Sequence, residues 1–425
     1  MIGRSLPPGA DRHSTAYSPA AGRRRRSLRA ASLGPAFIAG IAYVDPGNFA
    51  TNTSAGAQYG YLLLWVIVAA NLLAVLTQYL AVKLGIGTGE SLATNCRRRY
   101  GRGVSTGLWV QSQAVSIATD VAELLGGAVA LHLLFQVPLF QGVLLTACVS
   151  MLVLLLQGRR GDRSFQVIVL VMFGVIAGCL WWVLGMVGLD GSGIASGLVP
   201  RLEGSETLLL ATAMLGATVM PHAIYLHSAL PGPRLAELAI DDESKATAAR
   251  MSLVDVVCAM AVAGGVNLTM LLIAAHALSG TGATSLEDVH EGLGVAVGAA
   301  AATLFAVALL ASGVASTAVA TMAGSVIMQG FSGRFQSVLV RRGVTLVPAI
   351  AILALGVSPT TAMILSQAVL SLGIPFALFP LVRLTSDRAV MGSLVNGRVL
   401  RWSGMAMAVL VSALNLVLIA ILVLT

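Results

Sequence analysis

Long apolar segments separated by short polar ones run along the chain from residue 33 onward. A stretch of about 20 apolar residues is long enough to cross a bilayer as a helix. The pattern predicts eleven spans, with limits near 33–56, 62–82, 107–134, 139–156, 165–188, 207–229, 253–277, 294–328, 343–357, 361–382 and 403–424. We therefore expect an all-α polytopic membrane protein.

The composition supports a membrane protein and excludes several other classes. Of the 425 residues, 57% are hydrophobic and 10% are charged, whereas about 25% are charged in ordinary soluble proteins. This composition excludes a soluble enzyme and a disordered protein. A nucleic-acid binder is also excluded, because the net charge of +8 comes from arginines placed between apolar segments. A membrane-embedded hydrolase is disfavoured because the chain lacks an HExxH signature: Gly294 stands where the second histidine would follow His290-Glu291. We expect no enzymatic activity and no cofactor.

The distribution of basic residues predicts the orientation. With the N-terminus in the cytoplasm, Arg201 is the one basic residue of 26 that falls outside, as the positive-inside rule requires. The C-terminus is then outside. Residues 1–32, rich in arginine and without a signal-peptide pattern, are expected to be a disordered cytoplasmic tail. Residues 33–425 are expected to be a single transmembrane domain, because no polar segment is long enough to fold alone.

The first candidate site is Asp45-Pro46-Gly47-Asn48, in the middle of the first span. Proline removes a backbone donor and glycine loosens the helix, so the turn around Asp45 should unwind and free carbonyl groups. A carboxylate beside free carbonyls and the amide oxygen of Asn48 is a candidate cation site.

The second candidate site is in span six, at Gly216-Ala217-Thr218-Val219-Met220-Pro221-His222. Here the proline frees the carbonyls of Ala217 and Thr218. Broken spans five apart are typical of inverted-repeat transporters. We expect one five-helix repeat over about 33–188, a second over about 207–382, and an eleventh helix over about 403–424.

Met220 bears on the kind of metal. Most buried methionines only pack, but a thioether facing the Asp45–Asn48 turn favours transition metals over Mg²⁺ and Ca²⁺, which take oxygen ligands. A magnesium carrier of the same architecture and a sodium-coupled amino-acid symporter remain as alternatives.

Span three carries two acids, Asp120 and Glu123, on the helical face that also holds Gln113. Together with His222 they could form a proton relay, with Arg234 and Arg342 as partners at the inner gate. A structural polar network without proton movement is the alternative. His227 could join the relay or bond a neighbouring helix.

These motifs resemble those of the natural resistance-associated macrophage protein (Nramp) family of proton-coupled divalent metal transporters. The resemblance is carried by Asp45-Pro46-Gly47-Asn48, by Met220-Pro221-His222 with the residues up to Ser228, and by Ala118–Glu123 in span three. It extends to Ala311-Ser312-Gly313 with Ser316-Thr317, Leu365–Ser371, Pro375–Leu378 and Thr385–Gly392, so that it covers roughly residues 33–400.

The resemblance implies a LeuT-type inverted-repeat fold, with import of Mn²⁺ and Fe²⁺ together with protons across a bacterial-type inner membrane. It implies metal ligands at Asp45, Asn48, Met220, the Ala217 carbonyl and Gln367, and proton-pathway positions at Asp120, Glu123 and His222, with Arg234 and Arg342 as partners. No obligatory protein partner is expected. The chain departs from the family pattern at Gln113, Ala223 and Val314, which bears on proton coupling more than on the metal ligands.

Overall fold

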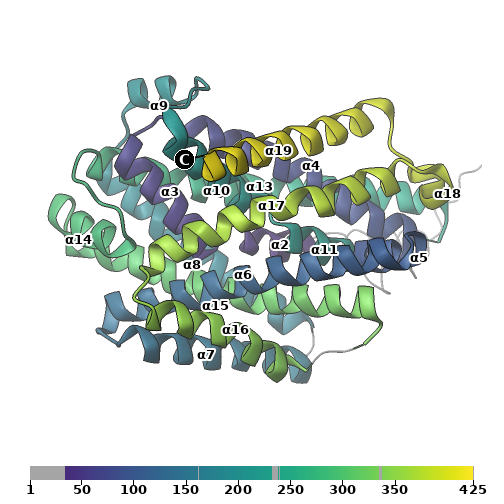
Figure 1. The fold of residues 1–425 in the computed structure, drawn as a ribbon, viewed down its shortest axis with the longest axis horizontal. Helices are drawn as coiled ribbons and strands as arrows, with labels where there is room; N and C mark the ends of the chain where they lie inside the picture. Colours follow the sequence, from purple (N-terminus) through teal and green to yellow (C-terminus); the bar gives the residue numbers. More distant parts are fainter. Residues whose placement is uncertain (1–33, 161, 232–237, 239, 335–336, 425) are drawn as a thin grey trace, which may run out of the picture.

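The computed structural model describes residues 34–160, 162–231, 238, 240–334 and 337–424, and these form helices joined by loops, without a strand (Figure 1). Eight helical segments are long and apolar enough to cross a membrane. The chain is thus an all-α, multi-pass membrane protein, as the hydropathy pattern predicted. The expected tail at 1–32 lies outside the described residues.

Long uninterrupted helices form most of the bundle. They are α4 (Leu64–Thr88), α6 (Arg102–Phe135), α7 (Leu139–Arg160), α8 (Asp162–Val187), α13 (Asp242–Leu278), α15 (Ala299–Ser332), α16 (Val338–Ala354), α17 (Pro359–Thr385) and α19 (Arg398–Leu424). Side chains such as Trp182 and Val171 on α8, which are 69% and 61% exposed, point outward. Exposed apolar side chains of this size are expected on a surface that faces lipid rather than water.

Two spans are interrupted, as predicted. The first consists of α2 (Pro35–Ala42) and α3 (Pro46–Tyr59), and the sixth consists of α10 (Gly204–Thr218) and α11 (Pro221–Ala229). In both spans the second helix begins at a proline. Proline is well suited to a first helical position, where its missing N–H group has no intrahelical partner in any case.

The interrupted spans lie inside the bundle (Figure 1). Helix α3 packs against α13, and α10 packs against α17. The α10–α11 segment is almost entirely buried, although it is no more apolar than its neighbours. Backbone groups freed at the breaks are therefore surrounded by protein rather than lipid, which is where broken helices are tolerated in membranes.

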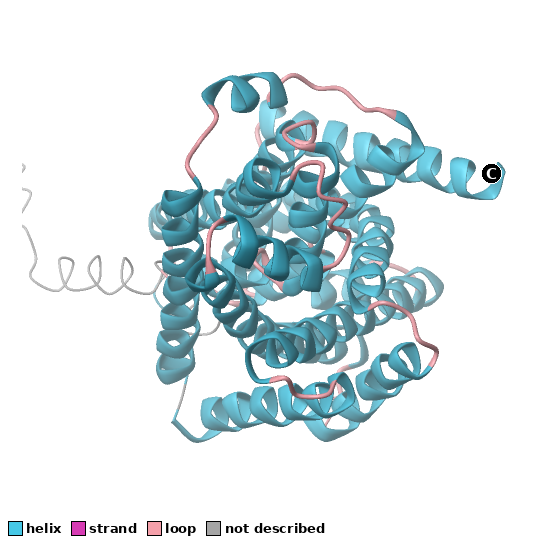
Figure 2. Cartoon of the chain, turned by 90° about the vertical axis from the view of Figure 1, so that its left-hand side faces the viewer, coloured by secondary structure: helices cyan, strands magenta, loops and turns pink. Residues whose placement is uncertain are grey.

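Short helices cap the two ends of the bundle. Helices α9 (Gly191–Gly197) and α14 (Leu286–Ala296) lie at one end, and α5 (Leu92–Arg99) and α18 (Arg388–Met391), which is followed by the 3₁₀ turn η1 (Gly392–Leu394), lie at the other (Figure 1). Figure 2 shows the molecule from the α9–α14 end. Hydropathy alone did not predict these helices, because they are too short or too polar to register as spans.

Several predicted boundaries differ from the structure, and two of the differences have a clear physical reason. The eighth predicted span, 294–328, joined parts of two helices, because α14 ends at Ala296 and α15 begins at Ala299. Gly298 between them has a φ of 122°, a conformation that glycine adopts readily. The seventh span begins earlier than residue 253, because Asp241 and Ser244 form a capping box that starts α13 in the polar loop.

Candidate metal site

Asp45 lies at the break in the first span and caps α3. Its backbone is extended, and its carboxylate Oδ1 accepts hydrogen bonds from the backbone N–H of Asn48 at 2.8 Å and from Asn48 Nδ2 at 2.6 Å. Both residues are completely buried. Capping and the positive end of the helix dipole stabilise the negative charge that Asp45 would otherwise carry alone in the interior.

The break in the sixth span meets the break in the first. Asn48 Nδ2 donates to the Ala217 carbonyl oxygen at 2.9 Å, across 169 residues of sequence. After Ala217 the helix ends at Thr218, and Val219 and Met220 have non-helical backbone conformations before Pro221 starts α11. The side chain of Met220 is also fully buried. Asp45, Asn48 and the Ala217 carbonyl are thus joined by hydrogen bonds, and Met220 lies buried in the same break of the sixth span. We call these four residues the junction.

Gln367 on α17 completes this junction. Its Nε2 donates to Asp45 Oδ2 at 3.2 Å. The approach depends on two glycines: a Cβ atom at Gly47 would lie 1.7 Å from Gln367 Nε2, and one at Gly216 would lie 2.0 Å from the Gln367 carbonyl oxygen. A larger residue at Gly47 would displace the Gln367 side chain, and a larger residue at Gly216 would displace the backbone of α17.

The junction offers oxygen donors of three kinds and one sulfur. They are the Asp45 carboxylate, the amide oxygens of Asn48 and Gln367, the Ala217 carbonyl and the Met220 thioether. The Asn48 and Gln367 amide oxygens are buried and have no hydrogen-bond partner. Buried polar atoms are usually paired, so two unpaired acceptors beside a carboxylate fit a cation-binding role.

Two further residues support the break, and the sequence motifs did not identify their role. Asn267 on α13 donates to the Tyr43 carbonyl at 2.8 Å, and Ser312 on α15 donates to the Val44 carbonyl at 2.6 Å. The carbonyls that the break frees upstream of Asp45 are thus occupied by side chains. Polar residues within predicted spans were the available signal, but their partners could not be read from the sequence.

The acids of span three lie on α6 and are fully buried. Asp120 forms an ion pair with Arg341 at 2.7 Å, and Arg341 also donates to Ser116 Oγ at 2.8 Å. Neither carboxylate oxygen of Glu123 has a hydrogen-bond partner, and the second oxygen of Asp120 lacks one as well.

Arg341 rather than the predicted Arg342 makes direct contact with an acid. Arg342 instead donates to Ser150 Oγ on α7 at 2.8 Å, and it is buried. The two arginines are adjacent in the sequence, and the rotation of α16 decides which of them faces α6. Arg234, the other predicted partner, lies outside the described residues.

His222 connects the second break to α6. Its Nδ1 lies 3.2 Å from Thr119 Oγ1, and its Nε2 is buried without a partner. His227, one and a half turns further along α11, has its Nδ1 2.7 Å from Gln78 Oε1, and Gln78 donates in turn to the Tyr43 hydroxyl. His227 thus bonds the neighbouring α4, the second of the two roles considered for it.

No group of three or more His, Cys, Asp or Glu side chains that could hold a metal occurs among the described residues. A metal at the junction would therefore be held by one carboxylate together with neutral ligands. Such a site carries little net charge of its own.

Comparison with known proteins agrees with the motifs. The family model described as natural resistance-associated macrophage protein-like matches residues 36–421. The chain is 49% identical over 397 residues to the divalent metal cation transporter MntH of Mycobacterium tuberculosis, a match that covers 91% of this chain and 90% of that one.

The solved structures give the same relationship. A crystal structure of a variant of the Eremococcus coleocola manganese transporter superposes with a TM-score of 0.82 at 32% identity, covering 92% of this chain and 86% of the other. A nucleobase-cation-symport-1 family transporter in a closed conformation shares the fold, with a TM-score of 0.59 at 15% identity. The match covers 90% of this chain and 87% of the other. The chain is a membrane transporter with a LeuT-type fold, and it belongs to the Nramp family.

Proposed function

We propose that the protein imports Mn²⁺, with Fe²⁺ as a second substrate, and that inward proton movement drives the transport by alternating access. The observation that carries this proposal is the closed junction at which the Asp45, Asn48, Ala217, Met220 and Gln367 donors gather between two broken helices. Relatives named as divalent metal cation and manganese transporters support it.

The donor set favours a transition metal. Oxygen donors alone suit Mg²⁺ and Ca²⁺, and Mg²⁺ keeps most of its water in proteins. The buried Met220 thioether gives softer divalent ions an additional ligand. A magnesium carrier gains little from sulfur. A sodium-coupled amino-acid symporter would need free backbone N–H groups to receive a carboxylate, whereas at the first break Asp45 already occupies the N-terminus of α3.

The proposed proton route leads from the metal junction into α6. His222 beside Thr119, the Asp120–Arg341 pair and the unpaired Glu123 form a buried polar series between the breaks and α16. Arg342, and Arg234 beyond the described residues, are proposed as further partners. Moving one elementary charge through 100 mV supplies about 2.3 kcal/mol, so even one proton per metal would bias uptake inward.

The closed junction represents one state of the proposed cycle. All five donor residues are buried in this conformation. A polar cavity of about 500 Å³ lies beyond α11, between α4, α5 and α15, and is lined among others by Ser228, Glu90 and Gln329. Opening the packing between this cavity and the junction would release the metal on the α5–α18 side.

The proposal includes the setting in the cell. We place the protein in a bacterial-type inner membrane, with the N-terminus and the α5–α18 end in the cytoplasm and the C-terminus outside. Metal ions, protons and lipid are its proposed partners. It needs no resident cofactor, since the metal is cargo, and no obligatory protein partner.

The direct test is uptake by purified protein in liposomes, with Mn²⁺, Fe²⁺, Mg²⁺ and Ca²⁺ offered in turn. Saturable Mn²⁺ uptake that increases when the outside is made acidic relative to the lumen is expected, and Mg²⁺ should neither enter nor compete. Mg²⁺ uptake without acid stimulation would contradict the proposed substrate, and amino-acid uptake driven by sodium would contradict the proposed class.

Replacing Met220 by alanine is expected to reduce the preference for Mn²⁺ over Ca²⁺ roughly tenfold, the factor produced by about 1.4 kcal/mol of lost metal–sulfur preference. Competition between the two ions in the liposome assay measures this ratio. Met220→Leu keeps the volume of the side chain but lacks sulfur, so it should show the same reduced preference. Met214→Ala, a buried truncation on α10 away from the break, should keep the original ratio. Unchanged selectivity in both Met220 variants would show that the side chain only packs.

A further inference from the structure

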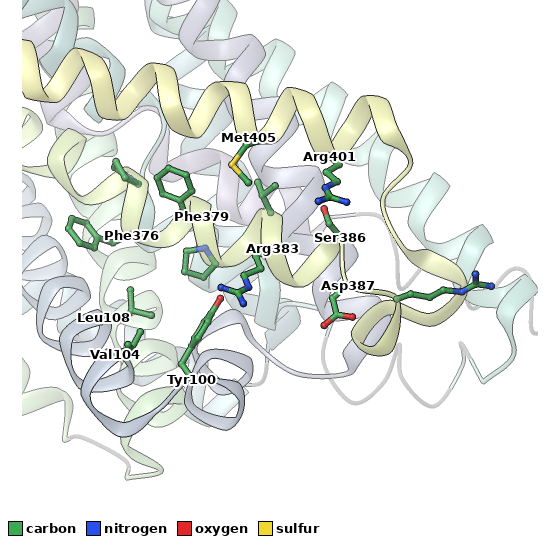
Figure 3. A pocket seen from close by; sticks show the side chains of 14 residues that line it. Tyr100, Val104, Leu108, Phe376, Phe379, Arg383, Ser386, Asp387, Arg401 and Met405 are labelled. Atoms are coloured by element: carbon green, nitrogen blue, oxygen red, sulfur yellow. The ribbon is translucent and has the colours of Figure 1, made fainter.

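A large groove lies outside the transport pathway, between α6, α17 and α19 (Figure 3). Its volume is about 960 Å³. Helix α17 packs against both α6 and α19 and forms the floor of the groove. Its lining includes the apolar and aromatic side chains of Val104, Leu108, Phe376 and Phe379 and the basic side chains of Arg383 and Arg401.

One part of the groove is apolar. Phe376 and Phe379 project from α17, and Val104 on α6 and Met405 on α19 form the sides (Figure 3). Phe376 is 50% exposed and Val104 is 57% exposed. Because these helices form the outside of a membrane-spanning bundle, the exposed apolar floor borders the hydrocarbon of the bilayer.

The other part of the groove is basic. Arg383 follows Phe376 and Phe379 on the same face of α17, four residues after Phe379, and Arg401 reaches the same end from α19 (Figure 3). Both arginines are exposed. Among the described residues, neither guanidinium forms an ion pair with an acid. The nearby Asp387 carboxylate accepts a hydrogen bond from the backbone N–H of Ala389 at 2.8 Å and caps α18.

An apolar part beside a basic part matches the acyl chains and the phosphate of an anionic phospholipid. Acyl chains need a concave apolar surface that is open to the bilayer, and an anionic phosphate needs guanidinium groups at the depth of the headgroups. A soluble peptide could not reach walls that lie within the membrane, and a free phosphate would not use the aromatic floor. We propose that this groove is a binding site for an anionic glycerophospholipid from the leaflet on the α18 side of the membrane.

The test is lipid binding by the purified full-length protein in neutral detergent. Phosphatidylglycerol and phosphatidylcholine are added in equal amounts, and native mass spectrometry measures the fraction of protein that carries each lipid. Phosphatidylglycerol should be preferred. The double substitution Arg383→Gln with Arg401→Gln should lower the affinity for phosphatidylglycerol about tenfold and leave phosphatidylcholine binding unchanged.

Matched variants separate this site from general charge attraction. Arg398→Gln removes an exposed arginine of α19 that does not line the groove, and it should bind phosphatidylglycerol as the unaltered protein does. Phe376→Gln should weaken the binding of the lipid, whereas Leu410→Gln, at a 62% exposed position of α19 outside the groove, should not.

A second measurement identifies the ligand. A lipid that binds only the folded protein raises the melting temperature, so phosphatidylglycerol should raise it and soluble glycerol phosphate at the same concentration should not. Equal protection by glycerol phosphate, equal binding of the two lipids, or an equal loss in Arg398→Gln would each overturn the proposal.

Discussion

Replacing Asp45 by alanine is expected to abolish Mn²⁺ uptake, with a loss of at least about 100-fold, because even indirect partners of metal ligands cost 10- to 100-fold when they are removed. Asp45 supplies the carboxylate of the proposed ligand set, and it also holds Asn48 and Gln367 through hydrogen bonds. Initial rates of Mn²⁺ uptake into liposomes, at saturating and limiting concentrations, measure the loss.

Asp45→Asn is the matched control, because alanine also removes the cap of α3. Asparagine caps helices about as well as aspartate, so this variant should fold like the unaltered protein while it lacks the charge proposed to bind the metal. We expect its uptake to be as low as that of the alanine variant. Substantial transport by Asp45→Asn would mean that the carboxylate serves the helix break rather than the ion.

Replacing Arg341 by alanine is expected to destabilise the folded protein by about 3–5 kcal/mol, the usual cost of leaving one charge of a buried pair without its partner. Arg341 and Asp120 pair at 2.7 Å, with side chains that are 5% and 0% exposed. Unfolding by titration with sodium dodecyl sulfate in mixed micelles measures the change.

The double variant Arg341→Ala with Asp120→Ala separates pairing from packing. If the cost comes from an unpaired Asp120, the double variant should be more stable than Arg341→Ala alone. Arg342→Ala removes a neighbouring buried arginine that donates to Ser150 rather than to an acid, and we expect a smaller loss from it. Additive losses in the double variant would show that the ion pair contributes no coupling energy.

The candidate metal site could be proposed from the sequence because its chemistry is local in the sequence. Asp45-Pro46 and Met220-Pro221 each place a ligand beside a proline within an apolar span, and a membrane tolerates such breaks only where the protein itself surrounds them. The motifs therefore led us to propose Asp45, Asn48, Ala217 and Met220 as ligands. Gln367 followed only from the resemblance to the family, since nothing around it breaks the helix.

The arginine that pairs with Asp120 could not be chosen from the sequence. Adjacent residues on a helix point about 100° apart, and hydropathy gives the position of a span along the chain without its rotation. The sequence analysis named Arg342, whereas the packing of α16 against α6 and α7 places Arg341 on Asp120 and Arg342 on Ser150. The same limit applies to Asn267 and Ser312, whose carbonyl partners are more than 200 residues away in the sequence.

The sequence by itself determined the membrane-spanning architecture and the two broken helices. In a bilayer the backbone N–H and C=O groups of each span must form hydrogen bonds within that span, so the length of a span and its interruption by proline can be read from consecutive residues. Only the tertiary structure decided which side chains meet at the breaks and how α6, α17 and α19 enclose a groove. It also showed that Gly47 and Gly216 leave room for the side chain and the backbone of Gln367. Those features depend on helix rotation and close packing between distant segments, which no local pattern encodes.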